Sequence, residues 1–326
     1  MKLKMFVSLV GLLIVATTQA RAQSPDYPTK QISLAVPFAA GGPTDTLARN
    51  LAVVMTQQLK QQVVVENVAG AGGTIAANRI AKGKPDGYSL LIAHIGMATA
   101  PALYRKLPFN PLTDFEYIGQ VADVPMMLIA KTALPPDNLT ELIAYIKKNT
   151  DKLNMGNAGL GAASHLCGLL FKAAIPADIT TIPYNGTAPA MTALMGGQID
   201  LMCDQTTNTT AQIKSGRVKV YGATSRKRVP SLSMVPTMAE QGWKDFEVVV
   251  WHGVYAPKGT PKPVIDKLVS ALQVSVQDVQ FKSRIAELGA QAVTKDKATP
   301  AALASHLKAE IEKWGPIIKK AGVYAD

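Results

Sequence analysis

Apolar residues along this chain follow two alternating patterns. Short runs of four to six apolar residues are typical of buried strands, whereas apolar residues recurring every three or four positions are typical of amphipathic helices. In residues 44–59, Leu47, Leu51 and Leu59 have the helical spacing, and residues 31–36 before them form an apolar run. The sequence therefore predicts a strand followed by a helix at the start of the folded chain.

The same two patterns continue almost to the end of the chain. They predict further strands over residues 62–67, 88–93, 115–131, 153–158, 179–184, 199–204, 218–224 and 246–257. They predict helices over residues 73–83, 97–104, 138–149, 163–174, 188–197, 208–216 and 238–242, and two amphipathic helices at the end. The last helix carries a stripe of Leu307, Ile311, Trp314 and Ile318. Short apolar strands alternating with helices indicate an α/β fold with parallel sheets covered on both faces.

Two extended segments, near residues 115–130 and 246–256, bracket a middle block with its own strand–helix–strand pattern. The simplest architecture is two α/β domains, the second inserted in the first, with two strands crossing between them side by side as a hinge. We expect domain 1 to comprise residues 23–122 and 250–326, and domain 2 residues 123–249. A ligand would then bind in the cleft between the domains.

The first 22 residues have the layout of a secretory signal peptide. Lys2 and Lys4 precede an apolar run from Phe6 to Ala16, and Ala20-Arg21-Ala22 offers a cleavage site after Ala22. The run is about half of the roughly 20 residues that a spanning helix needs, although a retained anchor is the alternative. We therefore expect a soluble protein of the bacterial periplasm.

The net charge and the distribution of basic residues indicate which kinds of partner the protein can bind. The formal net charge is +11, and without Lys2, Lys4 and Arg21 it becomes +8. The basic residues are scattered, which indicates a solvated surface, with a mild attraction for anions as the alternative. No basic stripe is interleaved with aromatic residues, so we expect no nucleic acid partner. We expect a monomer.

Histidine and cysteine spacing predicts neither a metal nor an organic cofactor. The four histidines are far apart in the sequence, and no Cys/His spacing suits zinc. Cys167 and Cys203 both lie in apolar segments. We expect two buried free thiols, which behave as small hydrophobic groups. A disulfide, which an exported protein can form, is the alternative.

Four glycine-rich or small-residue loops each follow a predicted strand and precede a predicted helix. They span residues 37–45, 93–98, 156–164 and 184–189. Ligands of open α/β sheets bind beyond the carboxyl ends of strands, and a helix N-terminus presents unpaired N–H groups with partial positive charge. Such loops can hold a carboxylate without a basic side chain; a tight turn with no ligand is the alternative for each loop. The candidate contacts are Phe38, Gly41, Gly42, Thr44, Asp45, His94, Gly96, Asn157, Gly159, Gly161, Ser164, His165, Tyr184 and Asp204.

Three other features admit a second interpretation. Residues 68–77 resemble a dinucleotide turn, but Ile75 occupies its third glycine position and an ordinary glycine turn is preferred. Ser164 and His165 are adjacent on a helix, which makes them a poor nucleophile–base pair, so His165 is expected to hydrogen-bond at the helix start. Trp251, on the second crossing strand, either packs in the hinge or walls the cleft.

These segments together resemble the Bug-type (TctC-like) solute-binding receptors of tripartite tricarboxylate transport systems. The matching pieces are YPTKQISLAVPFAAGGPTDTLAR, VVVENVAGAGGTIAA, KPDGYSLL, LYRKLPFNPLTDF, PYNGTAPAMTALMGGQIDLMCD and WHGVYAPKGTPKPVIDKL. They cover nearly the whole mature chain in order, and the ordered set is specific although no single piece is.

The resemblance implies a non-enzymatic periplasmic receptor with a type II-like two-domain fold. It would close on a small di- or tricarboxylate or an aromatic acid and deliver it to the membrane permease subunits of the transporter. A ligand sensor with a signalling partner, or an enzyme on the same scaffold, are the alternatives. The family often has Ser or Thr where this chain has Ala163 and an acidic residue where it has Leu169. These departures bear on which acid is bound.

Overall fold

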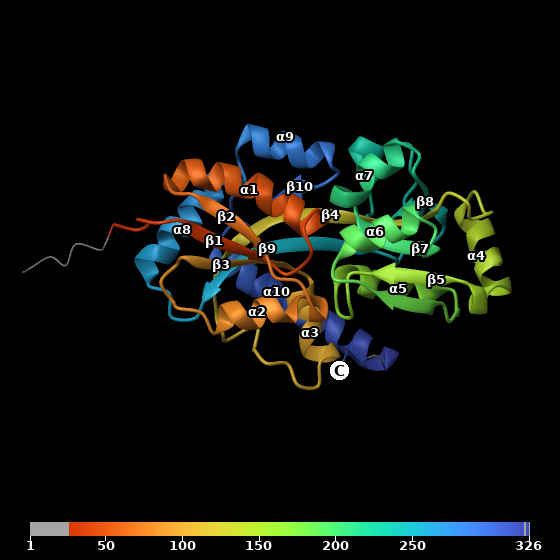
Figure 1. Ribbon diagram of the computed structural model, residues 1–326, viewed down its shortest axis with the longest axis horizontal. Helices are drawn as coiled ribbons and strands as arrows, with labels where there is room; N and C mark the ends of the chain where they lie inside the picture. Colours follow the sequence, from red (N-terminus) through yellow and green to blue (C-terminus); the bar gives the residue numbers. More distant parts are fainter. Residues whose placement is uncertain (1–25, 323, 326) are drawn as a thin grey trace, which may run out of the picture.

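The fold is a long mixed β-sheet with helices on both faces (Figure 1). The structure is a computed structural model that describes residues 26–322, 324 and 325. The expected signal peptide lies outside these residues. Within them the sheet has ten strands in the order β2-β1-β3-β9-β4-β7-β5-β6, and β8 and β10 each pair with β4.

The elements follow the predicted alternation of strands and helices. The strands are β1 (Ile32–Val36), β2 (Val63–Asn67), β3 (Ser89–His94), β4 (Phe115–Lys131), β5 (Asn154–Asn157), β6 (Thr180–Pro183), β7 (Leu201–Gln205), β8 (Val218–Ala223), β9 (Val249–Pro257) and β10 (Gln291–Ala292). The helices are α1 (Pro43–Leu59), α2 (Thr74–Ala81), α3 (Gly96–Leu103), α4 (Leu139–Lys148), α5 (Ala163–Ala174), α6 (Thr187–Met195), α7 (Thr206–Lys214), α8 (Lys262–Ser275), α9 (Val279–Glu287) and α10 (Pro300–Ala321). Short 3₁₀ turns lie at Ala71–Gly73, Thr150–Lys152, Pro230–Leu232 and Ala239–Gln241.

Strand β4 belongs to both halves of the sheet. Its residues 115–125 pair antiparallel with β9, from Phe115 opposite Pro257 to Pro125 opposite Val249. Its residues 126–131 pair instead with β7 and β8. The prediction that the two long extended segments lie side by side is confirmed. We refer below to the first half of the sheet (β1, β2, β3, β9, β10 and the start of β4) and the second half (the end of β4 and β5–β8).

Two predictions about these elements were wrong. The sheet is not purely parallel, because β9 pairs antiparallel with β3 and β4, and β4 pairs antiparallel with β7 and β8. The chain ends in three helices, not two. Helix α8 ends at Ser275, and Asp278 is the N-cap residue of α9. The Asp278 carboxylate accepts a hydrogen bond from the Phe281 N–H, which starts a separate helix.

Helices cover both faces of the first half of the sheet (Figure 1). One core joins α1, α8 and α9 to the sheet through Leu47, Leu268 and Phe281. The other joins α2, α3 and α10 to the opposite face and continues under α5. In the predicted stripe of α10, Leu307, Trp314 and Ile318 are buried and Ile311 is partly buried. The apolar periodicity therefore identified the packed face of this helix.

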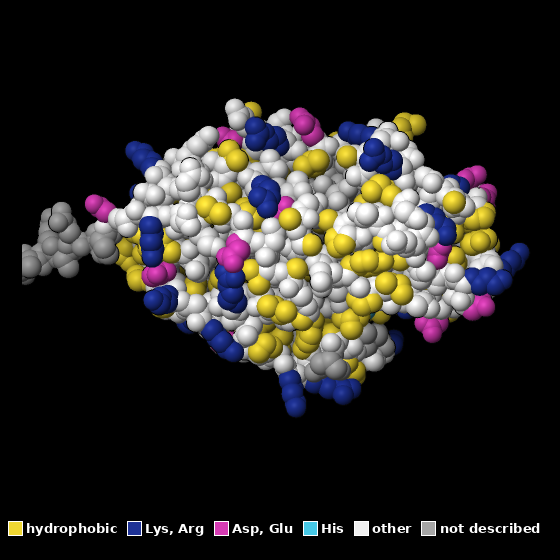
Figure 2. Space-filling view, viewed as in Figure 1, with side chains coloured by type: hydrophobic (Ala, Val, Ile, Leu, Met, Phe, Trp, Pro, Cys, Tyr) yellow, Lys and Arg dark blue, Asp and Glu magenta, His cyan; other side chains and the backbone are white. Residues whose placement is uncertain are grey.

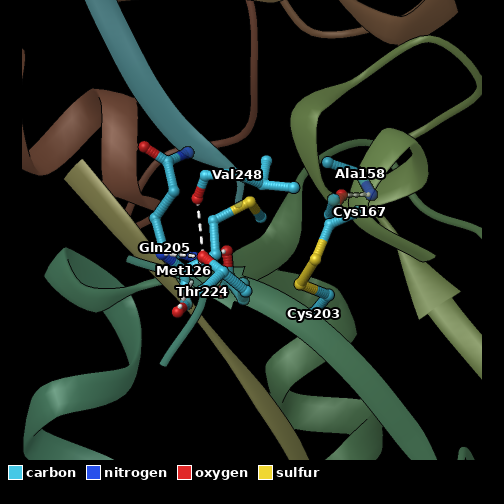
Figure 3. Close-up of a disulfide and its surroundings, with 9 residues drawn as sticks. Met126, Ala158, Cys167, Cys203, Gln205, Thr224 and Val248 are labelled. Atoms are coloured by element: carbon cyan, nitrogen blue, oxygen red, sulfur yellow. Dashed lines mark hydrogen bonds between the residues drawn. A yellow bond between two sulfur atoms is a disulfide. The ribbon is translucent and has the colours of Figure 1, made fainter. Parts of the chain in front are cut away.

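Cys167 and Cys203 form a disulfide between α5 and β7 (Figure 3). The preferred expectation of two free thiols was wrong, because the packing of α5 on β7 brings the two Cα atoms to 6.0 Å, within the range that a disulfide bridges. In residues 26–322, 324 and 325 no helix is long and apolar enough to cross a membrane, and no three His, Cys, Asp or Glu side chains group as metal ligands.

Candidate functional site

The loops beyond the strand ends of the two halves of the sheet meet and contact each other. The Ala39 N–H donates to Asn185 O (2.9 Å). The Thr99 hydroxyl donates to Gly161 O (3.1 Å), and the Tyr104 hydroxyl donates to Leu160 O (3.0 Å). On the face shown in Figure 2, Lys and Arg side chains are scattered and do not form one patch. The contact region is therefore held mainly by backbone groups and hydroxyls.

Glycines allow this close approach. A β-carbon at Gly72 would lie 1.9 Å from Leu160 O, and Gly159, with φ +103°, lies against Gly72. The glycines of residues 68–77, which resembled a dinucleotide turn, thus have a packing explanation. They let a loop of one half of the sheet pack directly on a loop of the other.

A small cavity lies where the loops meet. It is lined by Phe38, Pro43, Thr44, His94, Ala158, Ala163, Ser164, Thr187 and Gln205. Its volume is only about 10 Å³, about what one water molecule needs, so the loops would have to separate to admit an organic acid. None of these nine residues carries a formal positive charge at neutral pH. A ligand here would be held by hydroxyls, an amide and backbone groups.

Four helices begin at this cavity. Lining residues occupy the first turns of α1 (Pro43, Thr44), α5 (Ala163, Ser164) and α6 (Thr187), and Gln205 is the N-cap residue of α7. The N-cap side chains of these four helices make no capping hydrogen bond, although the Asp204 carboxyl accepts the Gln205 N–H at the start of α7. Uncapped N-termini leave N–H donors and partial positive charge, which favour an anion. Their convergence would favour an anion in the cavity without a basic side chain.

Phe38 and His94 form one wall of the cavity. Their rings stack with centroids 4.9 Å apart. A second small space of about 20 Å³, lined by Gly72, Gly96, Met97 and other residues, also contacts both rings. His94 Nδ1 accepts a hydrogen bond from the Gly96 N–H (2.9 Å). Burial lowers the pKa of His94 to about 4, so its imidazole is neutral at pH 7.

His252, on β9 opposite His94, supports Thr44 from behind. Its Nε2 lies 3.2 Å from Thr44 Oγ1, and the imidazole is buried. Burial, and next the neighbouring His94, lower the pKa of His252 well below its usual value. Trp251 is adjacent in the strand and its indole N–H donates to Glu310 Oε2 on α10 (3.1 Å). Of the two interpretations of Trp251, packing is therefore the one that the geometry supports.

Asp45 shapes the first loop and does not line the cavity. Its carboxylate accepts hydrogen bonds from the Gly41 N–H (2.9 Å), the Arg49 guanidinium (2.9 Å) and the Asn67 amide (2.9 Å). Burial raises the pKa of Asp45, but the bonds from Arg49, Gly41 and Asn67 outweigh it, and the net change is a lowered pKa. Since Asp45 already accepts the Gly41 N–H, that donor is not free for a ligand in this arrangement. Gly42 is the N-cap residue of α1.

Polar side chains also hold the loop after β5. Asn157 Oδ1 accepts from the Gly159 N–H (2.8 Å), Ser164 Oγ accepts from the Ala158 N–H (2.8 Å) and His165 Nδ1 accepts from the Gly161 N–H (3.1 Å). Burial lowers the pKa of His165 to about 4. His165 thus hydrogen-bonds at the start of α5, as expected. Because Ser164 Oγ accepts the Ala158 N–H, its own hydrogen can be donated to a ligand.

Asp204, Gln205 and Thr187 lie together at the end of β7 and the start of α6. Burial raises the pKa of Asp204 to about 7, and hydrogen bonds from Asn208 and the Gln205 N–H oppose this increase. The Thr187 hydroxyl is near this carboxyl and also opposes the increase. Even so, no group in the described part of the chain meets hydrogen-bond geometry with Thr187 Oγ1 or Gln205 Oε1.

The structure places four of the predicted residues on the cavity: Phe38, Thr44, His94 and Ser164. Gly96 lines the second space behind the ring stack. The other predicted residues lie in these loops or in the strand and helix ends beside them, and they do not line the cavity: Gly41, Gly42, Asp45, Asn157, Gly159, Gly161, His165, Tyr184 and Asp204. Sequence reasoning missed Thr187 and Gln205, although Thr187 follows Gly186 at a helix start in a loop that was selected.

Comparison with known proteins identifies the family. The description "Tripartite tricarboxylate transporter family receptor" (TctC) matches residues 47–323. The chain belongs to this receptor family. It is therefore a solute receptor of a periplasmic binding-protein family, which is not a family of enzymes.

Three solved structures are similar over most of their length. The periplasmic binding protein BugD is 54% identical with a TM-score of 0.90, over 91% of this chain and 99% of that one. MatC of Rhodopseudomonas palustris, with bound malate, is 38% identical with a TM-score of 0.87, over 90% and 100% of the two chains. A protein of R. palustris with adipate is 33% identical with a TM-score of 0.87, over 92% and 99%.

Proposed function

We propose that this protein captures a small organic carboxylate in the cavity between the loops and presents it to the membrane permease of a tripartite tricarboxylate-type transporter. The proposal rests mainly on one observation: four helix N-termini without N-cap side-chain bonds converge on a cavity with no basic side chain. The malate and adipate bound by two relatives support a dicarboxylate.

The proposed mechanism is a population shift between open and closed arrangements. The two units would be residues 23–122 with 250–326, and residues 123–249. Strand pairing supports this division, since β4 changes partners between Pro125 and Met126 and the pairing of β9 with β4 begins at Val249. A ligand that contacts Thr44 on one unit and Ser164 and Thr187 on the other favours the arrangement in which these groups are close.

A thermal-shift screen of mono-, di- and tricarboxylates and aromatic acids tests the capture step, because a ligand that binds only the folded state raises its Tm. We expect at least one dicarboxylate to raise the Tm, and calorimetry to give one site per chain. Neutral solutes of similar size serve as controls. If the neutral controls raise the Tm and no acid raises it, the proposal is contradicted. Uptake of the identified acid by cells with and without the gene tests delivery.

A further inference from the structure

Asp204 is a fully buried carboxyl beside the cavity that the proposed function does not use. Its neighbour in the chain, Gln205, lines the cavity, and so does Thr187, whose hydroxyl is near the Asp204 carboxyl. The Gln205 N–H (2.8 Å) and the Asn208 amide donate to the two carboxyl oxygens. These donors favour the carboxylate, whereas burial favours the neutral acid and has the larger effect.

No positive charge near Asp204 compensates a carboxylate there. The elements packed against β7 are β4, β5, α5, α6 and α7. None of their ionisable side chains is a cause of the raised pKa of Asp204, and neither is His94 across the cavity. Those side chains are Glu116, Tyr117, Asp123 and Lys131 on β4, His165 and Lys172 on α5, and Lys214 on α7.

An acid anion in the cavity would place a second negative charge beside this carboxyl. A nearby like charge favours the protonated form of a carboxyl group. The Thr187 hydroxyl acts in the same direction, because it has a single hydrogen to donate. An ionised Asp204 attracts that hydrogen, whereas a protonated Asp204 leaves it to the ligand. A bound anion and a protonated Asp204 therefore favour each other.

We propose, on the basis of the function proposed above, that the receptor takes up a proton from solvent at Asp204 when it binds its acid. The proton joins one carboxyl oxygen, and no other covalent bond changes. The Asn208 amide suits both forms, because its nitrogen can donate to a carboxylate and its oxygen can accept from a carboxylic acid. The receptor then holds the acid more tightly at neutral than at alkaline pH.

The pKa of Asp204 fixes the pH range in which this coupling is visible. Burial raises that pKa to about 7 in the unliganded protein. Below it Asp204 is already protonated, so binding takes up no proton and the affinity is at its highest. Above it each binding event needs a proton, and the affinity falls with rising pH. His94 and His165, each with a pKa lowered to about 4, stay neutral throughout this range.

Calorimetric titration with malate and with adipate, the acids bound by two relatives, tests the coupling. Both acids are fully ionised here, since carboxyl groups ordinarily ionise near pH 4. If the anion raises the pKa of Asp204 by about one to two units, the affinity falls about 5- to 50-fold from pH 7 to pH 9. At pH 8, buffers of low and high ionisation enthalpy should report an uptake of about 0.4–0.8 protons per acid.

Asp204→Asn carries no titrating group at this position. We expect its affinity to change less than about twofold between pH 7 and pH 9, and its proton uptake to be abolished. At pH 9 it should bind the acid more tightly than the wild type. Asp151→Asn, which removes one exposed carboxylate away from the cavity, is the matched control and should keep the wild-type pH dependence. If Asp204→Asn does not fold, Asp204→Ala replaces it.

The outcomes separate this inference from the proposed function. Binding of malate or adipate with constant affinity from pH 7 to pH 9 and no proton uptake overturns the inference and leaves carboxylate capture intact. An unchanged pH dependence in the folded Asp204 variant also overturns it. If neither acid binds, the dicarboxylate that gives the largest Tm increase in the screen replaces them, and binding of no acid overturns both proposals.

Discussion

At the residue scale, the proposed site relies on hydroxyls and backbone groups where many anion sites use charged side chains. Thr187 is the sharpest case, because it is buried at the cavity and its Oγ1, although near the Asp204 carboxyl, meets hydrogen-bond geometry with no described residue. A buried hydroxyl without a partner lowers stability unless a ligand satisfies it. We therefore expect the Thr187 hydroxyl to contact the ligand.

Thr187→Val keeps the shape of the side chain and removes the hydroxyl. We expect the affinity for the bound acid to fall about 10-fold or more, since a hydrogen bond to a charged group contributes about 1.5–3 kcal/mol. The Tm of the unliganded protein should stay the same or rise slightly. Thr192→Val, on the exposed side of the same helix, is the matched control. Wild-type affinity in Thr187→Val, measured by calorimetry, contradicts this role.

Asp204 gives a prediction on pH. Burial raises the pKa of Asp204 to about 7 in the folded protein, from an ordinary value of 3.8. Between these two pH values the folded state holds a proton that the unfolded state has lost, so Asp204 makes stability fall as pH rises from about 4 to about 7. Asp204→Asn should remove this contribution.

Urea unfolding of the wild type and Asp204→Asn from pH 4.5 to 8 measures the effect. His94 and His165 have lowered pKa values, which make stability rise with pH in the acid part of this range, but both proteins share these groups. The stability of the wild type relative to the variant should therefore fall towards pH 7 and then level off. A difference that does not change with pH contradicts the raised pKa.

At the element scale, the sequence predicted well which segments form helices and which form strands. It predicted less well which residues line the cavity. β4 (115–131) and α5 (163–174) have the predicted bounds because each is a continuous run of one pattern. Gln205 was missed because β7 extends one residue beyond the predicted end. Asp45 was selected as a contact, but its carboxylate is used within its own loop. Hydrogen bonds of this kind depend on how the loop folds, and no pattern of apolar and polar residues in the sequence indicates them.

The disulfide connects two elements that carry cavity residues. Cys167 lies three positions after Ser164 on α5, and Cys203 lies two positions before Gln205 on β7. A crosslink over a sequence separation of 36 residues is expected to stabilise the folded state by about 3–4 kcal/mol, mainly by restricting the unfolded chain.

We expect Cys167→Ala with Cys203→Ala to lose stability of this size and to bind the acid more weakly, because the start of α5 and the end of β7 are no longer fixed to each other. Denaturant unfolding and calorimetry are the measurements, and the wild type in reducing agent is the comparison. Equal unfolding curves for the wild type, the variant and the reduced protein would show that the crosslink is not stabilising.

At the scale of the whole molecule, the strand pair β4–β9 links two halves of a sheet whose loops meet around the cavity described above. Residues 115–131 form one continuous strand, so the relative position of the halves depends on β4 and on the start of β9. The cavity exists only where the loops of both halves are in contact, as through the bond from Ala39 N to Asn185 O. We therefore expect binding and closure to be coupled if the ligand contacts both sides, as proposed.

The central claim is that a carboxylate is held between the two sets of loops by helix N-termini. A crystal structure of the protein with the tightest-binding acid from the screen tests it most directly. We predict one ligand carboxylate within hydrogen-bond distance of groups from both sides, Thr44 or its helix start on one and Ser164 or Thr187 on the other, with no Lys or Arg in contact. A ligand bound outside the cavity, contacting one side alone, or held by a basic side chain would contradict the account.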